Sequence, residues 1–292
     1  MNRPKLILLV GVPGVGKSTY AKQYIPDYPK QVVHLSSDSI RAELYGDEST
    51  QGNPAEVFSL MQKRAIEALN NGNDVIYDAT NITRRDRASI IDICPKFAKI
   101  EAHIIWAPIN TCIERDAKRE RTVGKAVIDK MLKRFHAPYY DEGIDEIKII
   151  RPDDFDCDKY EVFCYEAMNI PHDNPHHTLN VQDHCWEARW YIERNNSSYN
   201  DLTFAAFIHD VGKPYTKAFV NSKGEPCDTA HFYQHQCVGA WMSYGYRRIT
   251  PHIAWLVSTH MDLYMNTKYY RSLPPFLKKE LDLLHEADRN AH

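Results

Sequence analysis

The residues near the amino terminus that are best suited to chemistry form a glycine-rich segment ending in lysine and serine. The segment Gly11-Val12-Pro13-Gly14-Val15-Gly16-Lys17-Ser18 fits the pattern G-x-x-x-x-G-K-[ST], whose backbone amides curl around nucleotide phosphates. Lys17 would bring a positive charge to the β- and γ-phosphates, and the Ser18 hydroxyl would ligate Mg²⁺. The segment therefore predicts a site for ATP or another nucleoside triphosphate with Mg²⁺, lined by Gly11, Gly14, Val15, Gly16, Lys17, Ser18 and Thr19.

Acidic residues stand at the ends of two later apolar runs in the same half of the chain. Asp38 follows residues 31–36, and Asp78 closes residues 74–78. A carboxylate beside a γ-phosphate can in general take the proton of an attacking hydroxyl. Asp38 is also a candidate helix N-cap, a position that Asp favours and that is compatible with such chemistry.

Residues 112–136 carry many basic side chains at helical spacing. Most such runs are solvated helix faces, but small kinases need mobile arginines that close over the transferring phosphoryl group. The break at Arg121-Thr122-Val123-Gly124 is expected to form the tip of such a lid. The basic residues are Arg115, Lys118, Arg119, Arg121, Lys125, Lys130, Lys133 and Arg134.

The second half of the chain is rich in histidine, with eleven of the 14 histidines beyond residue 170. The doublet His209-Asp210 lies in an apolar run, where burial is costly without coordination or hydrogen bonds. A single histidine is more often a packing residue than a ligand, but six candidates on separate helices favour a metal site. Neutral imidazole suits Mn, Fe, Co, Ni or Zn, so we expect one or two such ions. The candidate ligands are His177, His209, Asp210, His235, His260 and Asp288.

The elements that must position these residues differ between the two halves. Apolar runs at residues 5–10, 31–36, 74–78, 99–106 and 146–150 alternate with helical patterns, which predicts an α/β domain with a parallel sheet. Its carboxyl edge would gather the phosphate loop, Asp38 and Asp78. The second half predicts an all-α domain with a hairpin-like polar excursion near residues 217–228. Its expected helices are residues 178–195, 201–211, 231–244, 251–265 and 274–291.

The length of 292 residues suggests two domains, which we place at residues 1–152 and 173–292 with a connector at 153–172. The formal net charge of −3 provides no global field for polyanions, so nucleic-acid binding would need a local basic patch. The seven cysteines are scattered without a C-x-x-C pair, which predicts reduced thiols. Because no apolar run is long enough to span a bilayer and no secretory signal is present, we expect a cytoplasmic protein without a membrane partner.

Four motifs of the first half together resemble the kinase module of the 5′-OH polynucleotide kinase family, over roughly residues 1–150. They are Gly11–Ser18, Ser37–Arg41, Asp78–Asn81 and Arg115–Arg119. The resemblance implies that Asp38 is the general base on a 5′-hydroxyl and that Arg119 and Arg115 bind the donor phosphates. Asp78 would orient the acceptor or act on Mg²⁺ through water. The implied acceptor-binding residues are Arg41, Asp78 and Asn81.

Five motifs of the second half resemble the HD phosphohydrolase superfamily: residues 177–181, 209–214, 232–235, 257–260 and 286–288. In that family the first histidine, the His-Asp pair and the last aspartate hold one metal ion, and two intermediate histidines mark members with a second ion. The resemblance implies that His177, His209, Asp210 and Asp288 bind the first ion. His235 and His260 would then bind the second, and Lys213 would contact a phosphate. We leave open whether His184, on the same helical face as His177, contacts phosphate, binds metal or only packs.

A kinase joined to a metal phosphoesterase predicts nucleic-acid end healing, with DNA or RNA strand ends as substrates and a separate ligase as partner. Known enzymes that pair an HD module with a polynucleotide kinase place the HD module first, whereas here the kinase leads. One alternative is a nucleoside or sugar kinase fused to an HD nucleotidase; another is a nucleotide-sensing P-loop switch that regulates an HD hydrolase. Arg41 favours the polynucleotide interpretation, because a lone sugar has no flanking phosphate. The set Lys17, Ser18, Asp38 and Arg119 argues against an inactive switch.

Overall fold

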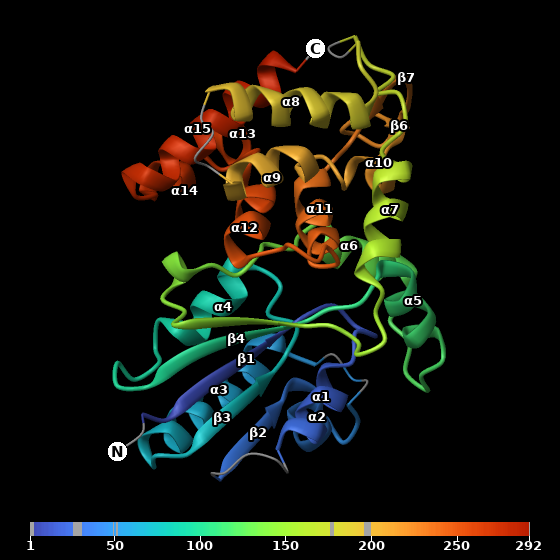
Figure 1. The fold of residues 1–292 in the computed structure, drawn as a ribbon. Coiled ribbons are helices and arrows are strands. Elements are labelled where there is room, and N and C mark those ends of the chain that lie inside the picture. Colours follow the sequence, from blue (N-terminus) through green and yellow to red (C-terminus); the bar gives the residue numbers. More distant parts are fainter. Residues whose placement is uncertain are drawn as a thin grey trace. The chain divides into compact units, whose positions relative to one another are not determined.

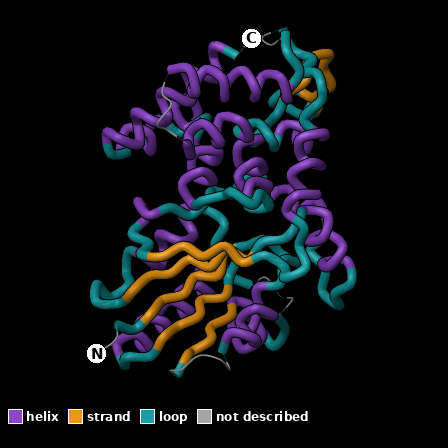
Figure 2. Tube along the Cα trace, viewed as in Figure 1, coloured by secondary structure: helices purple, strands orange, loops and turns teal. Residues whose placement is uncertain are grey.

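Five apolar runs in the first half form a parallel sheet with the strand order β2-β3-β1-β4-β5, as the sequence predicts (Figures 1 and 2). The central strands are buried on both faces, which explains why they are recognisable as continuous apolar segments. The predicted boundaries shift by one residue at Gln31 and at Trp106. The strands are β1 (Lys5–Val10), β2 (Val32–Ser36), β3 (Asp74–Asp78), β4 (Lys99–Ile105) and β5 (Glu146–Ile150).

This computed structural model describes residues 3–25, 31–48, 50, 52–175, 178–195 and 200–291. The chain divides into two units. The first comprises Met1–Met131 with Pro138–Asp153, and the second comprises Leu132–Ala137 with Asp154–His292.

The helices of the first unit begin at residues that satisfy their free backbone N–H groups. The Asn53 side chain accepts from the Ala55 N–H at the start of α3, and Thr83 forms a capping box with Asp86 at the start of α4. The predicted break at residues 121–124 separates α5 from α6. The helices are α1 (Lys17–Tyr24), α2 (Ser37–Tyr45), α3 (Pro54–Asn70), α4 (Arg84–Ile91), α5 (Ile109–Ala117), α6 (Lys125–Leu132) and the short 3₁₀ turn η1 (Tyr140–Glu142).

The second unit is built mainly of helices, and every residue of α11 is buried. The described part of the chain contains no helix long and apolar enough to cross a membrane. The helices are α7 (Cys157–Ala167), α8 (Val181–Asn195), α9 (Asn200–Ile208), α10 (Lys213–Thr216), α11 (His235–Ser243), α12 (Pro251–Thr259), α13 (Asp262–Met265), α14 (Thr267–Ser272) and α15 (Pro275–Asn290).

Two features of the second unit differ from the sequence-based expectation. The unit is not strictly all-α, because β6 (Ala218–Val220) and β7 (Pro226–His231) form an antiparallel hairpin where a hairpin-like excursion was expected. β6 has only three residues, and β7 mixes polar and small side chains, so neither shows the continuous apolar pattern that marks the first sheet. The expected connector also contains α7, whose first turn is capped by the Asp156 side chain. The aspartates around its start resemble a solvated loop in sequence.

Candidate functional site

The loop between β1 and α1 is shaped by close backbone packing. Gly14 has a φ of 77°, and a Cβ atom there would lie 2.1 Å from the carbonyl oxygen of Cys112 in α5. Gly16 has a φ of 104° and caps α1, whose first turn has no acidic residue. Only glycine adopts these backbone angles readily. The amino end of α1 is therefore open to an anion, as a phosphate-binding loop requires.

Lys17 and Ser18 both turn toward this loop and its neighbouring strand. The Lys17 ammonium donates to the carbonyl oxygens of Gly11 at 2.8 Å and Val12 at 3.2 Å. Burial lowers the pKa of Lys17, and the carboxylates of Asp78 and Asp38 oppose that effect. Lys17 thus lies in the low-dielectric surroundings where a positive charge acts most strongly on a phosphate.

Asp78 and Asn81, which the sequence groups with the acceptor, have different surroundings. Asp78 Oδ2 accepts from the Ser18 hydroxyl at 3.0 Å and lies 3.2 Å from His34 Nε2. This contact supports the Mg²⁺ alternative for Asp78. The Asn81 side chain is buried and donates to the Leu9 carbonyl at 2.8 Å, which ties the ends of β3 and β1 together. The geometry gives Asn81 a structural position and does not support the expected acceptor contact.

Asp38 lies in the first turn of α2 between two guanidinium groups. Its Oδ1 atom accepts from Arg41 Nη1 at 2.6 Å and from Arg121 Nη1 at 3.2 Å. The N-cap alternative does not apply, because the Ser36 hydroxyl caps this helix by accepting from the Asp38 N–H. Since 40% of the Asp38 side chain is exposed, its carboxylate is accessible to a substrate.

The arginines of the predicted lid stand close to the phosphate loop. Arg115 Nη1 lies 3.5 Å from the Val15 carbonyl oxygen. Arg119 is close enough to Lys17 to add, after burial, to the lowering of the lysine pKa. Asp116, which sequence reasoning did not single out, is buried and holds the lid tip. Its carboxylate accepts from the backbone N–H groups of Val123 at 3.0 Å and Gly124 at 2.9 Å. The sequence offered little signal for this role, because Glu114 and Glu120 also lie among the basic residues.

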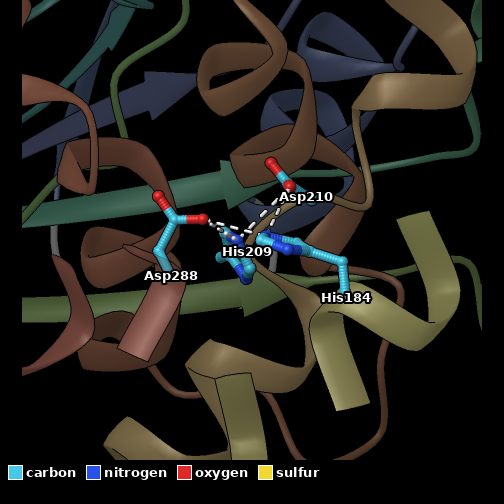
Figure 3. Close-up of side chains that lie close together, drawn as sticks. All are labelled: His184, His209, Asp210 and Asp288. Carbon is cyan, nitrogen blue, oxygen red and sulfur yellow. Dashed lines mark hydrogen bonds and ion pairs between the residues drawn. The ribbon is translucent and has the colours of Figure 1, made fainter. Parts of the chain in front are cut away.

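Four ionisable side chains of the second unit converge on one point (Figure 3). His184 comes from α8, His209 and Asp210 follow α9, and Asp288 comes from α15. One ligand atom from each lies within 4.8 Å of the others. Asp288 Oδ1 is 2.9 Å from His184 Nε2 and 3.3 Å from His209 Nε2. The sequence-predicted ligands His209, Asp210 and Asp288 are thus brought together.

Asp210 also belongs to a second group with His235 and His260. Its Oδ1 atom is 3.1 Å from His235 Nε2, and the Nε2 atoms of the two histidines are 3.0 Å apart. A carboxylate shared between two such groups is the arrangement in which one residue bridges two metal ions. The six side chains come from five segments, since His209 and Asp210 are adjacent in the chain, so only the folded unit assembles them.

The four histidines are oriented as metal ligands are. Each ring places Nδ1 against a backbone carbonyl, and because a carbonyl oxygen only accepts, Nδ1 carries the hydrogen and Nε2 the lone pair. The lone pairs of His235 and His260 therefore face each other, which a cation between them would stabilise. His209 Nε2 is buried and lies 3.3 Å from both Asp210 Oδ2 and Asp288 Oδ1. The carbonyl partners are Ala291 for His184, Ala206 for His209, Phe232 for His235 and Val257 for His260.

The charge state of the cluster also suits cations. Burial alone would raise the pKa of Asp210, but His209 and Lys213 outweigh burial and hold it well below its usual value. For Asp288, the contacts with His184 and His209 likewise outweigh burial and hold the pKa well below its usual value. Both carboxylates are therefore anionic near neutral pH, and the residues present fit a metal site with nitrogen and oxygen ligands.

His184 stands in the position that the sequence interpretation gave to His177. His177 lies outside the described residues, so its predicted role as a ligand is not tested. His184 is fully buried on the same face of α8 as Cys185, Ala188 and Ile192. The position of His184 on the apolar face of a helix was the sequence signal that could have distinguished it from His177 as a member of the cluster.

A short chain of hydrogen bonds fixes Lys213 beside the cluster. The Lys213 ammonium lies 2.5 Å from Asp210 Oδ2 and 3.0 Å from His172 Nε2. His172 Nδ1 in turn faces the Leu179 carbonyl at 2.8 Å, so its Nε2 accepts from the lysine. Burial and the Lys213 charge lower the pKa of His172 to about 4, which keeps the ring neutral near pH 7. Sequence reasoning identified Lys213 but missed His172, which is remote in sequence.

Comparisons with known proteins concern mainly the first unit. Residues 6–138 match the family model AAA_33, described as an AAA domain. The L-seryl-tRNA(Sec) kinase of Methanococcus maripaludis is 29% identical over 138 residues, which are 46% of this chain and 53% of that protein. The chain thus spans about half the length of this curated relative.

Similar solved structures include kinases, all at TM-scores below 0.5. A structure of the Pnkp1/Rnl/Hen1 RNA repair complex is 26% identical, with a TM-score of 0.42, and the match covers 46% of this chain and 44% of that chain. A fungal RNA kinase is 12% identical, with a TM-score of 0.40 and coverages of 59% and 45%. Together with the phosphate loop and the parallel sheet, the sequence matches show that residues 6–138 form a P-loop kinase domain similar to a seryl-tRNA kinase.

Proposed function

We propose that the protein heals nucleic-acid ends with two activities. The first unit phosphorylates a 5′-hydroxyl with ATP, and the second, an HD-type phosphohydrolase, removes a 2′,3′-cyclic phosphate or 3′-phosphate. The observation that carries the kinase assignment is the Asp38–Arg41 ion pair of α2, in which Asp38 Oδ1 and Arg41 Nη1 are 2.6 Å apart. Helix α2 follows β2, the strand next to β3. The ion pair combines a base for a hydroxyl with a cation for a neighbouring phosphate.

The kinase step follows from the positions of these residues. As the 5′-oxygen bonds to the γ-phosphorus, the hydroxyl proton passes to Asp38 and the bond to the β-phosphate oxygen breaks, which releases ADP. Lys17, Arg115 and Arg119 offset the charge of the transferring group. Ser18 would hold Mg²⁺, with Asp78 orienting the hydroxyl of Ser18.

Two points favour a nucleic-acid acceptor over a free nucleoside or sugar. Arg41 has a use only if the acceptor carries a phosphate near its hydroxyl. The similar protein from Methanococcus maripaludis is named for a tRNA-linked acceptor. DNA or RNA strand ends as substrates, a separate ligase as partner and a cytoplasmic location remain parts of this proposal.

The phosphohydrolase assignment is supported by the orientation of the four histidines. His184, His209, Asp210 and Asp288 would hold one metal ion, and His235 and His260 would join Asp210 around a second. Such ions activate a water and stabilise the leaving oxygen of a phosphoester. Lys213 is positioned to contact the phosphate, and His172 fixes its ammonium group.

An oligonucleotide with a 5′-hydroxyl and a 3′-phosphate or 2′,3′-cyclic phosphate tests both activities in one reaction. The reaction contains radiolabelled ATP, Mg²⁺ and either Mn²⁺ or Ni²⁺. We expect Asp38→Ala to lower 5′ transfer by about 100-fold or more, since general-base catalysis is lost, while 3′ clearing continues. His209→Ala should show the reverse pattern. If the protein phosphorylates a free nucleoside but no oligonucleotide, the proposed nucleic-acid end-healing function is wrong.

A further inference from the structure

Arg121 connects the lid tip with the acceptor side of the kinase domain. Its Nη1 atom donates to Asp38 Oδ1 at 3.2 Å and to the Glu48 carbonyl at 2.6 Å, beyond the end of α2. The other lid arginines face the donor side, because Arg115 lies against the phosphate loop and Arg119 lies near Lys17. The lid thus presents arginines to both sides of the reaction centre.

The position of Arg121 is specified by the fold. The buried Asp116 carboxylate holds the backbone N–H groups of Val123 and Gly124, which fixes the loop just beyond Arg121. The Arg121 side chain is 22% exposed, and that of Arg41 is 13% exposed. Guanidinium groups held in this way lose little side-chain freedom when a planar or tetrahedral anion binds.

The charges around Asp38 favour the binding of an anion. Two guanidinium groups converge on one carboxylate, so the acceptor side carries one positive charge more than Asp38 balances. Asp38 Oδ1 accepts N–H bonds from both guanidinium groups, which holds the two arginines beside the carboxylate that would take the hydroxyl proton. A bound phosphate would compete with Oδ1 for those N–H groups.

We propose that Arg121 acts with Arg41 to bind the phosphate that flanks the attacking hydroxyl, and so determines the preference for phosphate-bearing acceptors. This inference rests on the proposed kinase function. The acceptor phosphate takes N–H bonds from both arginines. Asp38 then receives the hydroxyl proton as the new phosphoester bond forms and ADP leaves. An acceptor without that phosphate leaves the arginines on Asp38.

Two small acceptors that differ only in the phosphate test the role of Arg121. A nucleoside 3′-monophosphate and the matching nucleoside are compared in wild type, Arg121→Ala and Arg121→Lys. We expect Arg121→Ala to lower kcat/KM for the monophosphate by about 10- to 100-fold, the range of a hydrogen bond to a charged group. The kcat/KM for the nucleoside should fall much less than that for the monophosphate, because the nucleoside has no phosphate for Arg121 to bind. The KM for ATP should stay unchanged, and Arg121→Lys should restore part of the preference. Arg64→Ala, an exposed arginine paired with Glu43, is the matched control.

The outcomes separate this inference from the function on which it rests. A raised KM for ATP with equal losses on both acceptors would assign Arg121 to the donor and overturn the inference. So would a preference that survives in Arg121→Ala. A wild-type protein that shows no preference for the monophosphate, or phosphorylates neither acceptor, would instead overturn the polynucleotide kinase proposal.

Discussion

At the scale of single residues, the four histidines of the second unit are oriented by the ring nitrogen that faces away from the cluster. A Nδ1–H that donates to a backbone carbonyl fixes both the tautomer and the ring plane, so Nε2 is directed toward the cluster. For His209, His235 and His260 the carbonyl lies three residues earlier in the chain, whereas the carbonyl for His184 belongs to Ala291. Three of the four rings are therefore oriented by local backbone, and only the ring of His184 by backbone that the fold brings to it.

The geometry of the quartet predicts that His184, and not His177, is the metal ligand that precedes the His209-Asp210 pair. We expect His184→Ala to lose metal, because it removes an atom 2.9 Å from Asp288 Oδ1 in the quartet. His177→Ala should keep its metal, since the described quartet already supplies four ligands. Metal content of the purified proteins, measured by mass spectrometry after equal loading, checks both. The reverse result would restore the ligand set that the family resemblance implies.

Residue patterns differ in how much of the site they predict. The phosphate loop is contiguous, so spacing alone identified Lys17 and Ser18. The roles of Asp38 and Arg41 came instead from the resemblance to the polynucleotide kinase family. Asp116 binds backbone N–H groups seven and eight residues further on, and His172 pairs with Lys213 across 41 residues; no motif covers either contact.

At the scale of elements, strand β4 carries a fully buried glutamate. Glu101 is surrounded by His103 and by lysines from three adjacent strands: Lys5 at 2.9 Å, Lys99 at 3.0 Å and Lys148 at 3.0 Å. Burial alone would raise the pKa of Glu101, but these four partners outweigh it and lower the pKa far below its usual value. The strands are thus joined by ion pairs as well as by backbone hydrogen bonds.

This lowered pKa predicts acid sensitivity. Below the ordinary value of 4.5 the unfolded chain binds a proton at Glu101 that the folded protein does not, so stability is present above that pH and falls as the pH drops. We expect Glu101→Gln to reduce the slope of the unfolding free energy against pH by about 1.4 kcal/mol per pH unit. Urea unfolding at several pH values would measure this slope. The fluorine signal of fluorinated tryptophan at Trp106, which is buried in the first unit, reports the unfolding. An unchanged pH slope would show that Glu101 titrates normally.

The same scale shows why some elements were predictable and others not. A parallel strand that is buried on both faces is apolar along its whole length, so β1, β3 and β4 stand out in the sequence. In the hairpin, β6 is only three residues long and β7 lacks a continuous apolar run. Helix α7 begins among aspartates, one of which caps it, and composition alone does not separate a capped helix from a solvated loop.

At the scale of the whole molecule, charge limits how nucleic acid can bind. Because the net charge is −3, attraction of a nucleic acid would have to come from a local group of arginines, chiefly Arg41 and Arg121 on the acceptor side. We expect binding of a single strand to the kinase site to depend weakly on salt. Two or three phosphate contacts give a slope of about −1.4 to −2 in log affinity against log salt. A fluorescence anisotropy titration of a 5′-hydroxyl oligonucleotide checks this, and a slope of about −5 or steeper would indicate a much broader basic surface.

The two units carry their candidate sites on different kinds of scaffold. The first unit places its groups at the carboxyl edge of a sheet, and the second assembles its ligands from helices. Length alone predicted the presence of two domains, but the assignment of residues 132–137 to the second unit could not be derived from a linear boundary.

The contact between Gly14 and the Cys112 carbonyl also determines where the kinase domain can bend. Backbone that packs this closely leaves no room for sliding, so the phosphate loop and the body of α5 move as one rigid piece. The Asp116 carboxylate extends this constraint to Val123 and Gly124, so a closing motion would have to break these two hydrogen bonds or carry the lid tip along with α5. Arg115 would in either case meet the donor already in place.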